Sequence, residues 1–411
     1  MVFITSDYNP KTMWMEFSDD EVSRLSFIKA CPVCGEDESL RPVVKLGPKH
    51  FKNMIQIGIC SHCFSITYMN PPSSNFFEDY YANTWNTARG ENVENLNIAS
   101  YKSDGKFARI LDAISLKNKS AKILDFGCGN GAKLSGLKDA GFSEVHGIEA
   151  SSYRAAVTEK NFPGRVYFGQ YQDYDRPRDF DVVCSNHVLE HVFSPGDALK
   201  WIVESTNNDA VIVINVPNCE AESVVAQCLF LPHLHSMSKK AMQVLAEKYD
   251  LKLFFFKSKR NTEISAIFIK GSPDVDLTGD TIIEGASVEH SPLEARIERI
   301  QAPWKLEKGE KTISYGMTHN GKSLSQRVNG YTTVTGFRSV IYRGLTSIFK
   351  ILRKLGMVEL SKRMYFFLPR LSNDETELLN FCYVHVRAEK TTECDIPRVS
   401  LRDDRLGLLM K

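Results

Sequence analysis

Residue types that could carry chemistry are concentrated in one short glycine-rich segment. Asp125 lies near the end of an apolar run, and Gly127, Gly129 and Gly131 follow at alternate positions before a helical pattern begins. Glycines let the main chain approach a nucleotide-like ligand without a clash at Cβ. Glu149 ends the next apolar run, where a carboxylate can accept both hydroxyls of a ribose. The spacing therefore predicts a nucleoside-containing ligand at this turn.

The same letters also satisfy the fingerprint of dinucleotide-binding proteins, because Ala132 can stand in its third small position. Asp125 favours a different ligand. Its carboxylate would repel a pyrophosphate, whereas it would attract the ammonium group of S-adenosylmethionine. We therefore expect S-adenosylmethionine as the cofactor. A nicotinamide or flavin cofactor and a site that has lost its ligand are the alternatives.

Two pairs of cysteines with two-residue spacing lie in the N-terminal part, Cys31 with Cys34 and Cys60 with Cys63. Each pair can bring two thiolates to one ion, and two pairs complete a tetrahedral shell of four sulfur ligands. We predict a structural Zn²⁺ site, in which His62 could replace one cysteine. A redox pair or free buried thiols are the alternatives. Four thiolates leave no coordination position for a substrate, so this zinc would hold the module together.

Strand-like apolar runs alternate with segments of helical spacing between about residues 100 and 272. The expected strands are 122–126, 145–148, 166–168, 180–184, 210–216, 251–256 and 264–269. The expected helices are 132–140, 152–160, 195–205 and 238–249. This alternation predicts parallel βαβ units, and the short connection between the last two strands predicts an antiparallel pair. The predicted fold class is α/β, with a doubly wound, Rossmann-like, mostly parallel sheet and an antiparallel last strand, plus an N-terminal zinc ribbon and a mixed C-terminal region.

The glycine turn, Glu149 and the segment 180–192, which contains the letters LEHV, resemble the class I S-adenosylmethionine-dependent methyltransferases. The likeness covers about residues 100–272. With the cysteine module included, residues 25–272 are similar to bacterial methyltransferases that carry an N-terminal zinc-binding domain. Among these are the sugar C-methyltransferases that act on nucleotide-linked deoxysugars. The resemblance implies methyl transfer to a small-molecule or nucleotide-sugar acceptor.

The resemblance also implies which residues bind the donor. They lie at or just beyond the carboxyl ends of the expected strands: Asp125, Gly127, Gly129, Gly131, Glu149, Gln170 and Asn186. In the family the glycines line the methionine part of the donor, the first acid faces its amino group and the second acid faces its ribose. An acid after the third strand often reads the adenine, and Gln170 is the substitute here. Asn186 lies at the sheet edge where donor and acceptor meet.

Methyl transfer is an in-line displacement, so the remaining chemical task is to remove a proton from the acceptor, for which histidine is the commonest base. Four histidines are candidates: His187, His191, His233 and His235. The sugar C-methyltransferases have a YHEH-like segment that supplies the base, and at residues 232–235 this chain keeps His235 of it. We therefore expect His187 and His235 to be catalytic and His191 to be a packed structural residue.

A chain of 411 residues is long enough for two or three domains. We expect a cysteine module at 25–85, a methyltransferase domain at 86–272, a linker at 272–287 and a C-terminal region of unknown role at 288–411. Residues 337–370 show a basic amphipathic pattern. It predicts a helix that packs on the protein's own core or makes a peripheral contact with an anionic membrane or an acidic partner.

The charge balance bears on partners, because Lys+Arg 51 against Asp+Glu 50 leaves a net charge of +1 and no global field for nucleic acid. No targeting signal or membrane-spanning apolar run is readable, so we expect a cytoplasmic protein. A zinc-finger RNA base methyltransferase and a noncatalytic scaffold are alternative hypotheses. The sequence does not determine the methylated atom, which could be carbon, oxygen or nitrogen, or the oligomeric state.

Overall fold

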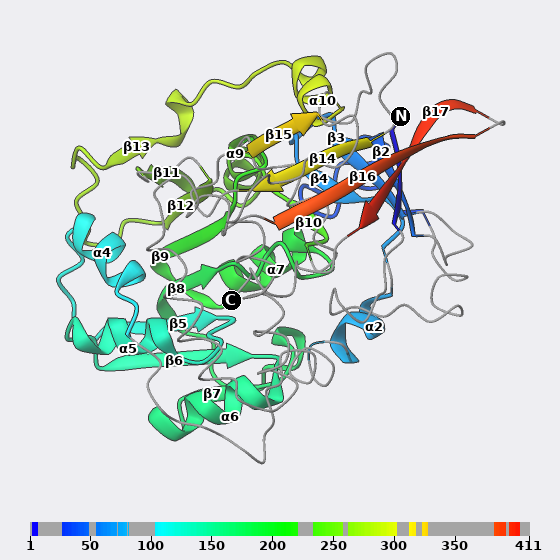
Figure 1. Ribbon diagram of the computed structural model, residues 1–411. Helices are drawn as coiled ribbons and strands as arrows, with labels where there is room; N and C mark the ends of the chain where they lie inside the picture. Colours follow the sequence, from blue (N-terminus) through cyan, green and yellow to red (C-terminus); the bar gives the residue numbers. More distant parts are fainter. Residues whose placement is uncertain are drawn as a thin grey trace, which may run out of the picture.

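The structure is a computed structural model that describes residues 2–6, 27–48, 55–71, 73–79, 81, 103–220, 233–257, 262–301, 312–317, 323–327, 382–391 and 394–402. Two β-sheets organise these residues (Figure 1). The middle of the chain forms one sheet, and strands from both ends of the chain meet in the other.

The central sheet contains eight strands among the described residues. Their spatial order is β13 (Ile282–Glu284), β11 (Lys252–Phe256), β12 (Glu263–Lys270), β9 (Thr206–Pro217), β8 (Phe180–Asn186), β5 (Lys122–Phe126), β6 (Glu144–Glu149) and β7 (Val166–Phe168). The strands from β7 to β9 pair in parallel, and β12 is antiparallel to both of its neighbours. The predicted α/β class and antiparallel last strand are confirmed. The strand order reverses between β5 and β8, and the carboxyl ends of the strands at such a reversal are where open α/β sheets bind their ligands.

Helices cover both faces of this sheet, as a doubly wound fold requires. One face packs against α4 (Lys106–Ala113), α5 (Ala132–Asp139) and α6 (Ser152–Asn161). The other face packs against α7 (Pro195–Glu204) and α9 (Lys239–Lys248). Serine hydroxyls at Ser151, Ser194 and Ser238 accept hydrogen bonds from main-chain N–H groups in the first turns of α6, α7 and α9. These caps start the helices close to the positions expected from the sequence.

The second sheet contains nine strands among the described residues. Their order is β10 (His235–Ser236), β4 (Ile66–Tyr68), β3 (Ile55–Cys60), β2 (Leu40–Pro48), β1 (Val2–Ser6), β17 (Cys394–Arg402), β16 (Cys382–Thr391), β14 (Thr312–Met317) and β15 (Ser323–Arg327). The first strand of the chain pairs in parallel with both β2 and β17. Strands from the cysteine module and from the C-terminal region therefore share one sheet (Figure 1).

The expected linker at 272–287 differs from the structure. It contains β13, which pairs with β11, and a single 3-10 turn at Gly285–Ser287. The domain limits 25–85, 86–272 and 288–411 stay a prediction, and the basic pattern at 337–370 lies outside the described residues. The remaining described elements are the helices α2 (Ser74–Asp79) and α10 (Leu293–Gln301) and a 3-10 turn at Tyr171–Asp173.

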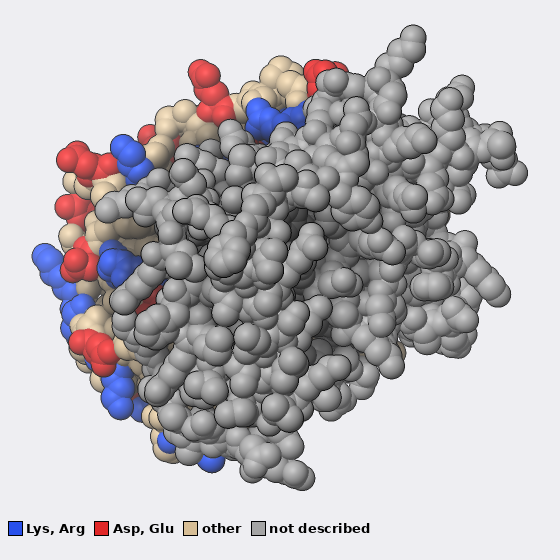
Figure 2. All heavy atoms as spheres, in the orientation of Figure 1, with Lys and Arg blue, Asp and Glu red and all other residues tan. Residues whose placement is uncertain are grey.

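The described surface visible in Figure 2 carries lysine, arginine, aspartate and glutamate side chains interspersed with one another. This mixture agrees with the balanced composition of the chain. In the part of the chain that the structure describes, no helix combines the length and the apolar character that crossing a bilayer requires.

Candidate functional site

The glycine turn connects β5 to α5 at the point where the strand order reverses. Gly127, Gly129 and Gly131 have φ values of +78°, +57° and +80°, which side chains with a Cβ rarely adopt. A Cβ on Gly127 would lie 2.3 Å from Cγ2 of Val188. A Cβ on Gly129 would have its nearest neighbour, Nη1 of Arg154, 4.0 Å away. Gly129 therefore faces the open side of the turn, where a ligand can approach the main chain.

Two carboxylates flank this turn. Asp125 is 1% exposed, and neither of its oxygens has a hydrogen-bond partner among the described residues. Burial raises its pKa to about 7, although the charge of Lys133 opposes the shift. Glu149 accepts hydrogen bonds from the N–H groups of Gly129 and Ser151, each at 2.8 Å. An unpartnered buried carboxyl beside an open stretch of main chain fits the cationic methionine end of S-adenosylmethionine.

The raised pKa of Asp125 predicts that donor binding depends on pH. Because the pKa is about 7, most of this carboxyl is protonated at pH 6 and most is charged at pH 8. We expect the affinity for S-adenosylmethionine to rise several-fold between these values, since only the charged form attracts the donor's ammonium. Calorimetric titration measures this. Asp125→Asn should bind S-adenosylmethionine more weakly, and its affinity should no longer change with pH. If the affinity of Asp125→Asn still changed with pH, another group would be responsible for the pH dependence.

Asn186 and Asn215 lie opposite each other on β8 and β9 at the same edge of the sheet. Oδ1 of Asn186 and both amide atoms of Asn215 are buried without a partner among the described residues. Asn215 was missed by sequence reasoning, although a polar residue within the apolar run 210–216 was a usable signal. Gln170 is half-buried two residues beyond β7, whose last residue, Phe168, has an exposed side chain. Asn186 and Asn215 therefore offer amide donors and acceptors at the carboxyl edge of the sheet.

His187 lies directly after β8 with a φ of +55° and forms the centre of a charged chain. Its Nδ1 is 3.0 Å from Oε1 of Glu190, and its Nε2 is 2.8 Å from Oε1 of Glu263. Burial would lower the pKa of His187, but the two carboxylates outweigh it and raise the pKa to about 9. Lys106 donates to Oε2 of Glu263 at 2.7 Å. The structure thus adds Glu190, Glu263 and Lys106 to the predicted site residues.

Three other histidines lie in or near the LEHV turn, residues 189–192: His191, His233 and His235. Nδ1 of His191 is 2.9 Å from the hydroxyl of Tyr81, and its ring packs edge-on against that of His233 with centroids 4.7 Å apart. His235 is 2% exposed, and both of its ring nitrogens contact protein atoms. Burial lowers the pKa of His233 to about 3 and that of His235 to about 4, so both rings are neutral.

The four cysteines of the N-terminal module lie together and are buried. Cys31 Sγ is 3.8 Å from Cys63 Sγ, and Cys34 Sγ is 3.7 Å from Cys60 Sγ. A metal ion bound at about 2.3 Å to four tetrahedral sulfurs requires sulfurs about 3.8 Å apart. Hydrogen bonding from the Cys31 thiol lowers the pKa of Cys60, which favours a thiolate there. The cluster therefore fits a closed tetrahedral metal site, while His62 is exposed at the surface.

The two cysteine turns have matching main-chain geometry. Gly35 N–H donates to Cys31 O at 2.7 Å, and Phe64 N–H donates to Cys60 O at 3.0 Å. Both residues have positive φ, +84° for Gly35 and +61° for Phe64. Phe64 thus occupies the position where the first turn has glycine, and the second turn keeps its geometry despite the side chain.

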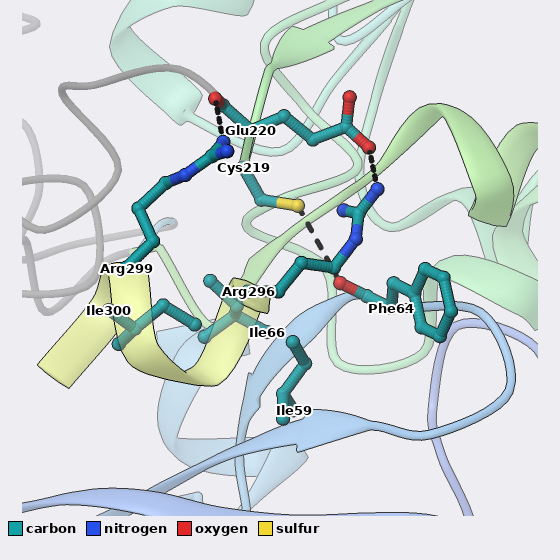
Figure 3. Close-up of a pocket in the computed structure, with 8 residues that line it drawn as sticks. All are labelled: Ile59, Phe64, Ile66, Cys219, Glu220, Arg296, Arg299 and Ile300. Carbon is teal, nitrogen blue, oxygen red and sulfur yellow. Dashed lines mark hydrogen bonds and ion pairs between the residues drawn. The ribbon is translucent and has the colours of Figure 1, made fainter. Parts of the chain in front are cut away.

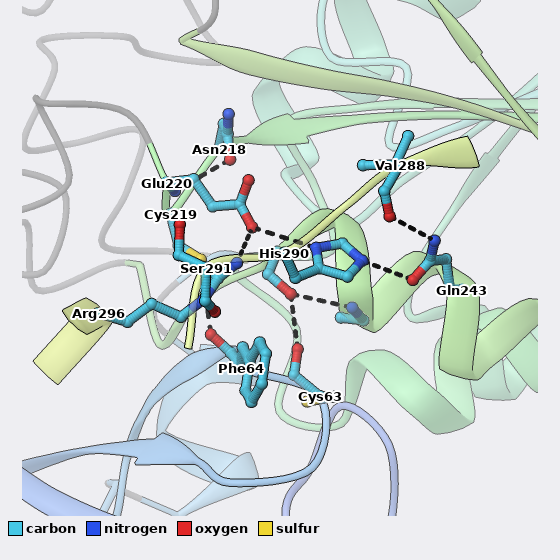
Figure 4. A network of polar contacts seen from close by, with 12 residues as sticks. Cys63, Phe64, Asn218, Cys219, Glu220, Gln243, Val288, His290, Ser291 and Arg296 are labelled. Carbon is cyan, nitrogen blue, oxygen red and sulfur yellow. Dashed lines mark hydrogen bonds and ion pairs between the residues drawn. The ribbon is translucent and has the colours of Figure 1, made fainter. Parts of the chain in front are cut away.

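A small pocket separate from the glycine turn lies between the second cysteine turn and α10 (Figure 3). Glu220 accepts a hydrogen bond from Arg296 at 2.6 Å, and the Arg296 guanidinium lies over the Phe64 ring, 4.7 Å from its centroid. Figure 4 shows the network continuing through His290 to Gln243 of α9. These contacts join the cysteine module, α9 and α10, and we assign them a packing role.

Comparisons with known proteins agree with this geometry. Residues 99–254 match the sequence profile of a family described as a methyltransferase domain. This range contains the glycine turn, both flanking carboxylates and the LEHV turn. The chain therefore carries a methyltransferase domain of the class I, S-adenosylmethionine-dependent type.

One curated relative is the mitochondrial ubiquinone biosynthesis O-methyltransferase of Schizosaccharomyces pombe, which is 32% identical over 102 residues. The match covers 23% of this chain and 37% of that protein, so the chain spans little more than a third of the relative's length.

Solved structures with a similar fold include a SAM dependent methyltransferase from Archaeoglobus fulgidus, with 16% identity over 45% of this chain and 98% of that chain and a TM-score of 0.35. Another is the sugar N-methyltransferase KedS8 from Streptoalloteichus, with 22% identity over 29% of this chain and 49% of that chain and a TM-score of 0.25. At these scores the similarity carries no functional conclusion for this chain.

Proposed function

We propose that this chain transfers the methyl group of S-adenosylmethionine to a small or carrier-linked acceptor, and that the acceptor is a nucleotide-linked or related sugar of polysaccharide or secondary-metabolite synthesis. The main support for S-adenosylmethionine as the donor is the buried, unpartnered carboxyl of Asp125 beside the open Cβ position of Gly129. The acceptor class is supported by the resemblance of residues 25–272 to zinc-containing sugar methyltransferases.

The donor supplies an electrophilic methyl group on a sulfonium, so the protein's main task is to align the acceptor behind that methyl. Asp125 would hold the donor's amino group by charge, and Glu149 would hold its ribose hydroxyls with the lone pairs that its two N–H bonds leave. Gly129 would leave room for the donor's body against the main chain. Asn186 and Asn215 would provide hydrogen bonds to the acceptor at the carboxyl edge of the sheet.

We assign removal of the acceptor proton to His187, oriented by Glu190. Its side chain is 35% exposed at the carboxyl end of β8, whereas His235 has both ring nitrogens engaged by the protein. Glu190 is fully buried and holds Nδ1, which leaves Nε2 to exchange Glu263 for the acceptor. A carboxylate that fixes the tautomer of a histidine base is the arrangement that general-base catalysis requires.

The raised pKa of His187 predicts the pH dependence of the reaction. A base must be neutral, and with a pKa of about 9 only about one molecule in a hundred has neutral His187 at pH 7. We expect the rate of methyl transfer to rise about tenfold per pH unit and to level off above about 9. The measurement is initial rate against pH with labelled donor. Glu263→Gln should move the midpoint of the pH–rate curve to lower pH. A rate that decreased as the pH rose towards 9 would contradict the assignment of His187 as the base.

The ion pairs of His187 with Glu190 and Glu263 also stabilise the folded protein while His187 is charged. Because the folded pKa of His187 is raised from 6.5 to about 9, this contribution is fully present below pH 6.5 and is lost as pH rises through about 9. Above about pH 9, where His187 is neutral and can act as a base, the protein therefore loses the stability that the charged imidazolium contributes.

We propose that the cysteine cluster binds Zn²⁺ and that this ion is structural. The four buried sulfurs lie within 4.8 Å of one another, and two of their separations, 3.8 and 3.7 Å, match a tetrahedral shell of the thiolate ligands that zinc prefers. A metal held by four thiolates has no position for water or substrate, so proton transfer falls to the histidine and carboxylate side chains.

The proposed activity is tested in two stages with the full zinc-loaded chain. Calorimetric titration with S-adenosylmethionine should show one bound donor, and incubation with labelled donor and a panel of nucleotide sugars should place label in the sugar fraction. A folded chain that binds no donor would favour a noncatalytic scaffold. Label transferred to RNA and to no sugar would contradict the acceptor class.

A further inference from the structure

His235 connects the cysteine module to the turn that carries Glu190. Its Nδ1 is 2.6 Å from the hydroxyl of Thr67 on β4. Its Nε2 is 3.1 Å from Val192 O and 3.2 Å from Phe193 O, and its main-chain N–H donates to Glu190 O at 3.2 Å. Carbonyl oxygens only accept, so Nε2 carries the proton and Nδ1 accepts from Thr67. One neutral ring thus fastens both segments.

Further contacts fix the same junction. Strand β10 pairs with β4 in a register that places His235 opposite Thr67. The Ser238 hydroxyl donates to Cys63 O at 2.6 Å and also caps α9. Lys248, at the other end of α9, donates to Cys34 O at 3.0 Å. The carbonyl groups of two cysteines in the metal cluster are therefore tied to the helix that follows His235.

We propose that His235 is a positioning residue, through which the cysteine module and its metal hold the Glu190 turn so that Glu190 meets His187. This inference rests on the proposed function, because it gives the module a part in arranging the base. Thr67 and His235 are both buried, and hydrogen bonds are electrostatically stronger in such an interior than in water. Loss of the clamp would leave β8 in place but free the turn at 190–193.

The charged groups that face His187 determine how its pKa would change if the turn at 190–193 moved. Glu190 faces it from the turn and Glu263 from β12, with Lys106 of α4 behind Glu263. The rings of His191 and His233 lie beyond Glu190 and interact with its charge. When Glu190 withdraws, Glu263 is the carboxylate left on the ring, so the imidazolium of His187 loses one of its two partners. Its pKa then falls.

The test uses Thr67→Val in the full zinc-loaded chain, because valine keeps the shape of threonine and removes only the hydroxyl that contacts His235. Histidine ring nitrogens are selectively labelled with ¹⁵N, and His187 is assigned among the ten histidines by His187→Gln. We expect the NMR titration midpoint of His187 to fall by at least one pH unit in Thr67→Val. Affinity for S-adenosylmethionine should stay within twofold.

The matched control is Thr206→Val, which removes a buried threonine hydroxyl bonded to Val203 O at the opposite end of the sheet. Its His187 midpoint should equal that of the unchanged chain. If Thr67→Val does not fold, His235→Gln provides the second variant, since its amide can reach the carbonyls of Val192 and Phe193 but not Thr67.

An unshifted His187 midpoint in the folded variant would overturn the proposal. The NMR measurement requires neither donor nor acceptor, so failure of methyl transfer would not affect it. A chain that transfers methyl groups while Thr67→Val leaves His187 unchanged would contradict the clamp and leave the proposed function standing.

Discussion

Gly129→Val is expected to weaken S-adenosylmethionine binding by more than about 100-fold. Gly129 is the glycine of the turn whose Cβ position is open, so a valine there would project its methyl groups into the space proposed for the donor. A clash with the bound donor could not be relieved by moving a neighbouring side chain, because none lies closer than 4.0 Å to this Cβ position. The φ of +57° adds about 1–2 kcal/mol of backbone cost, because left-handed geometry is unfavourable for a residue with a Cβ. Calorimetric titration with the donor measures the loss of binding.

Gly141→Val separates the steric effect from the backbone cost. Gly141 has a φ of +91° and nothing within 4 Å of its Cβ position, and it lies in the turn between α5 and β6. This variant should lose similar stability and bind the donor normally. Equal loss of binding in both variants would mean that backbone strain, rather than occupied space, explains Gly129→Val. Unchanged binding in Gly129→Val would remove the donor from this turn.

The central sheet could be predicted from the sequence because its signals are local. The adjacent parallel strands β5 and β8 are short apolar runs that are largely buried, and serine caps mark where α6, α7 and α9 begin. The glycine turn was readable for the same reason, since three alternate glycines require a special main-chain path. The cysteine cluster followed from two pairs of cysteines with two-residue spacing, a pattern typical of zinc sites.

Other features depend on pairings between residues distant in the sequence. The parallel partnership of β1 with β17 joins the two ends of the chain, and no periodicity within either segment announces it. Glu263 reaches His187 from a strand 76 residues further along, where it reads as a polar strand end. The hydrogen bond between His235 and Thr67 forms only because β10 pairs with β4, two segments that are far apart in the sequence. Phe64 adopts a φ of +61°, a left-handed geometry that its residue type does not predict.

Cys31→Ser is expected to destabilise the methyltransferase domain as well as the cysteine module. All four cysteines pack in the same apolar core as Leu124, Phe126 and Val183 of the central sheet. Gly196, at the start of α7, donates to the carbonyl of Pro32, so the first cysteine turn also touches that helix. A serine oxygen is a poor zinc ligand, and loss of the ion would leave three buried thiolates to be protonated or exposed. The module therefore cannot loosen without disturbing the sheet that carries the donor site.

The magnitude follows from the free energy that structural zinc supplies, about 10–16 kcal/mol in small peptides. Even a third of that would lower the melting temperature by about 10 °C in a domain of this size. Calorimetry measures the melting temperature, and elemental analysis should show one zinc per unchanged chain and none in Cys31→Ser. Cys184→Ser is the matched control, because Cys184 is equally buried but lies in β8 away from the cluster. It should keep its zinc, whereas a Cys31→Ser chain that retained both zinc and melting temperature would contradict a structural zinc site that needs all four sulfurs.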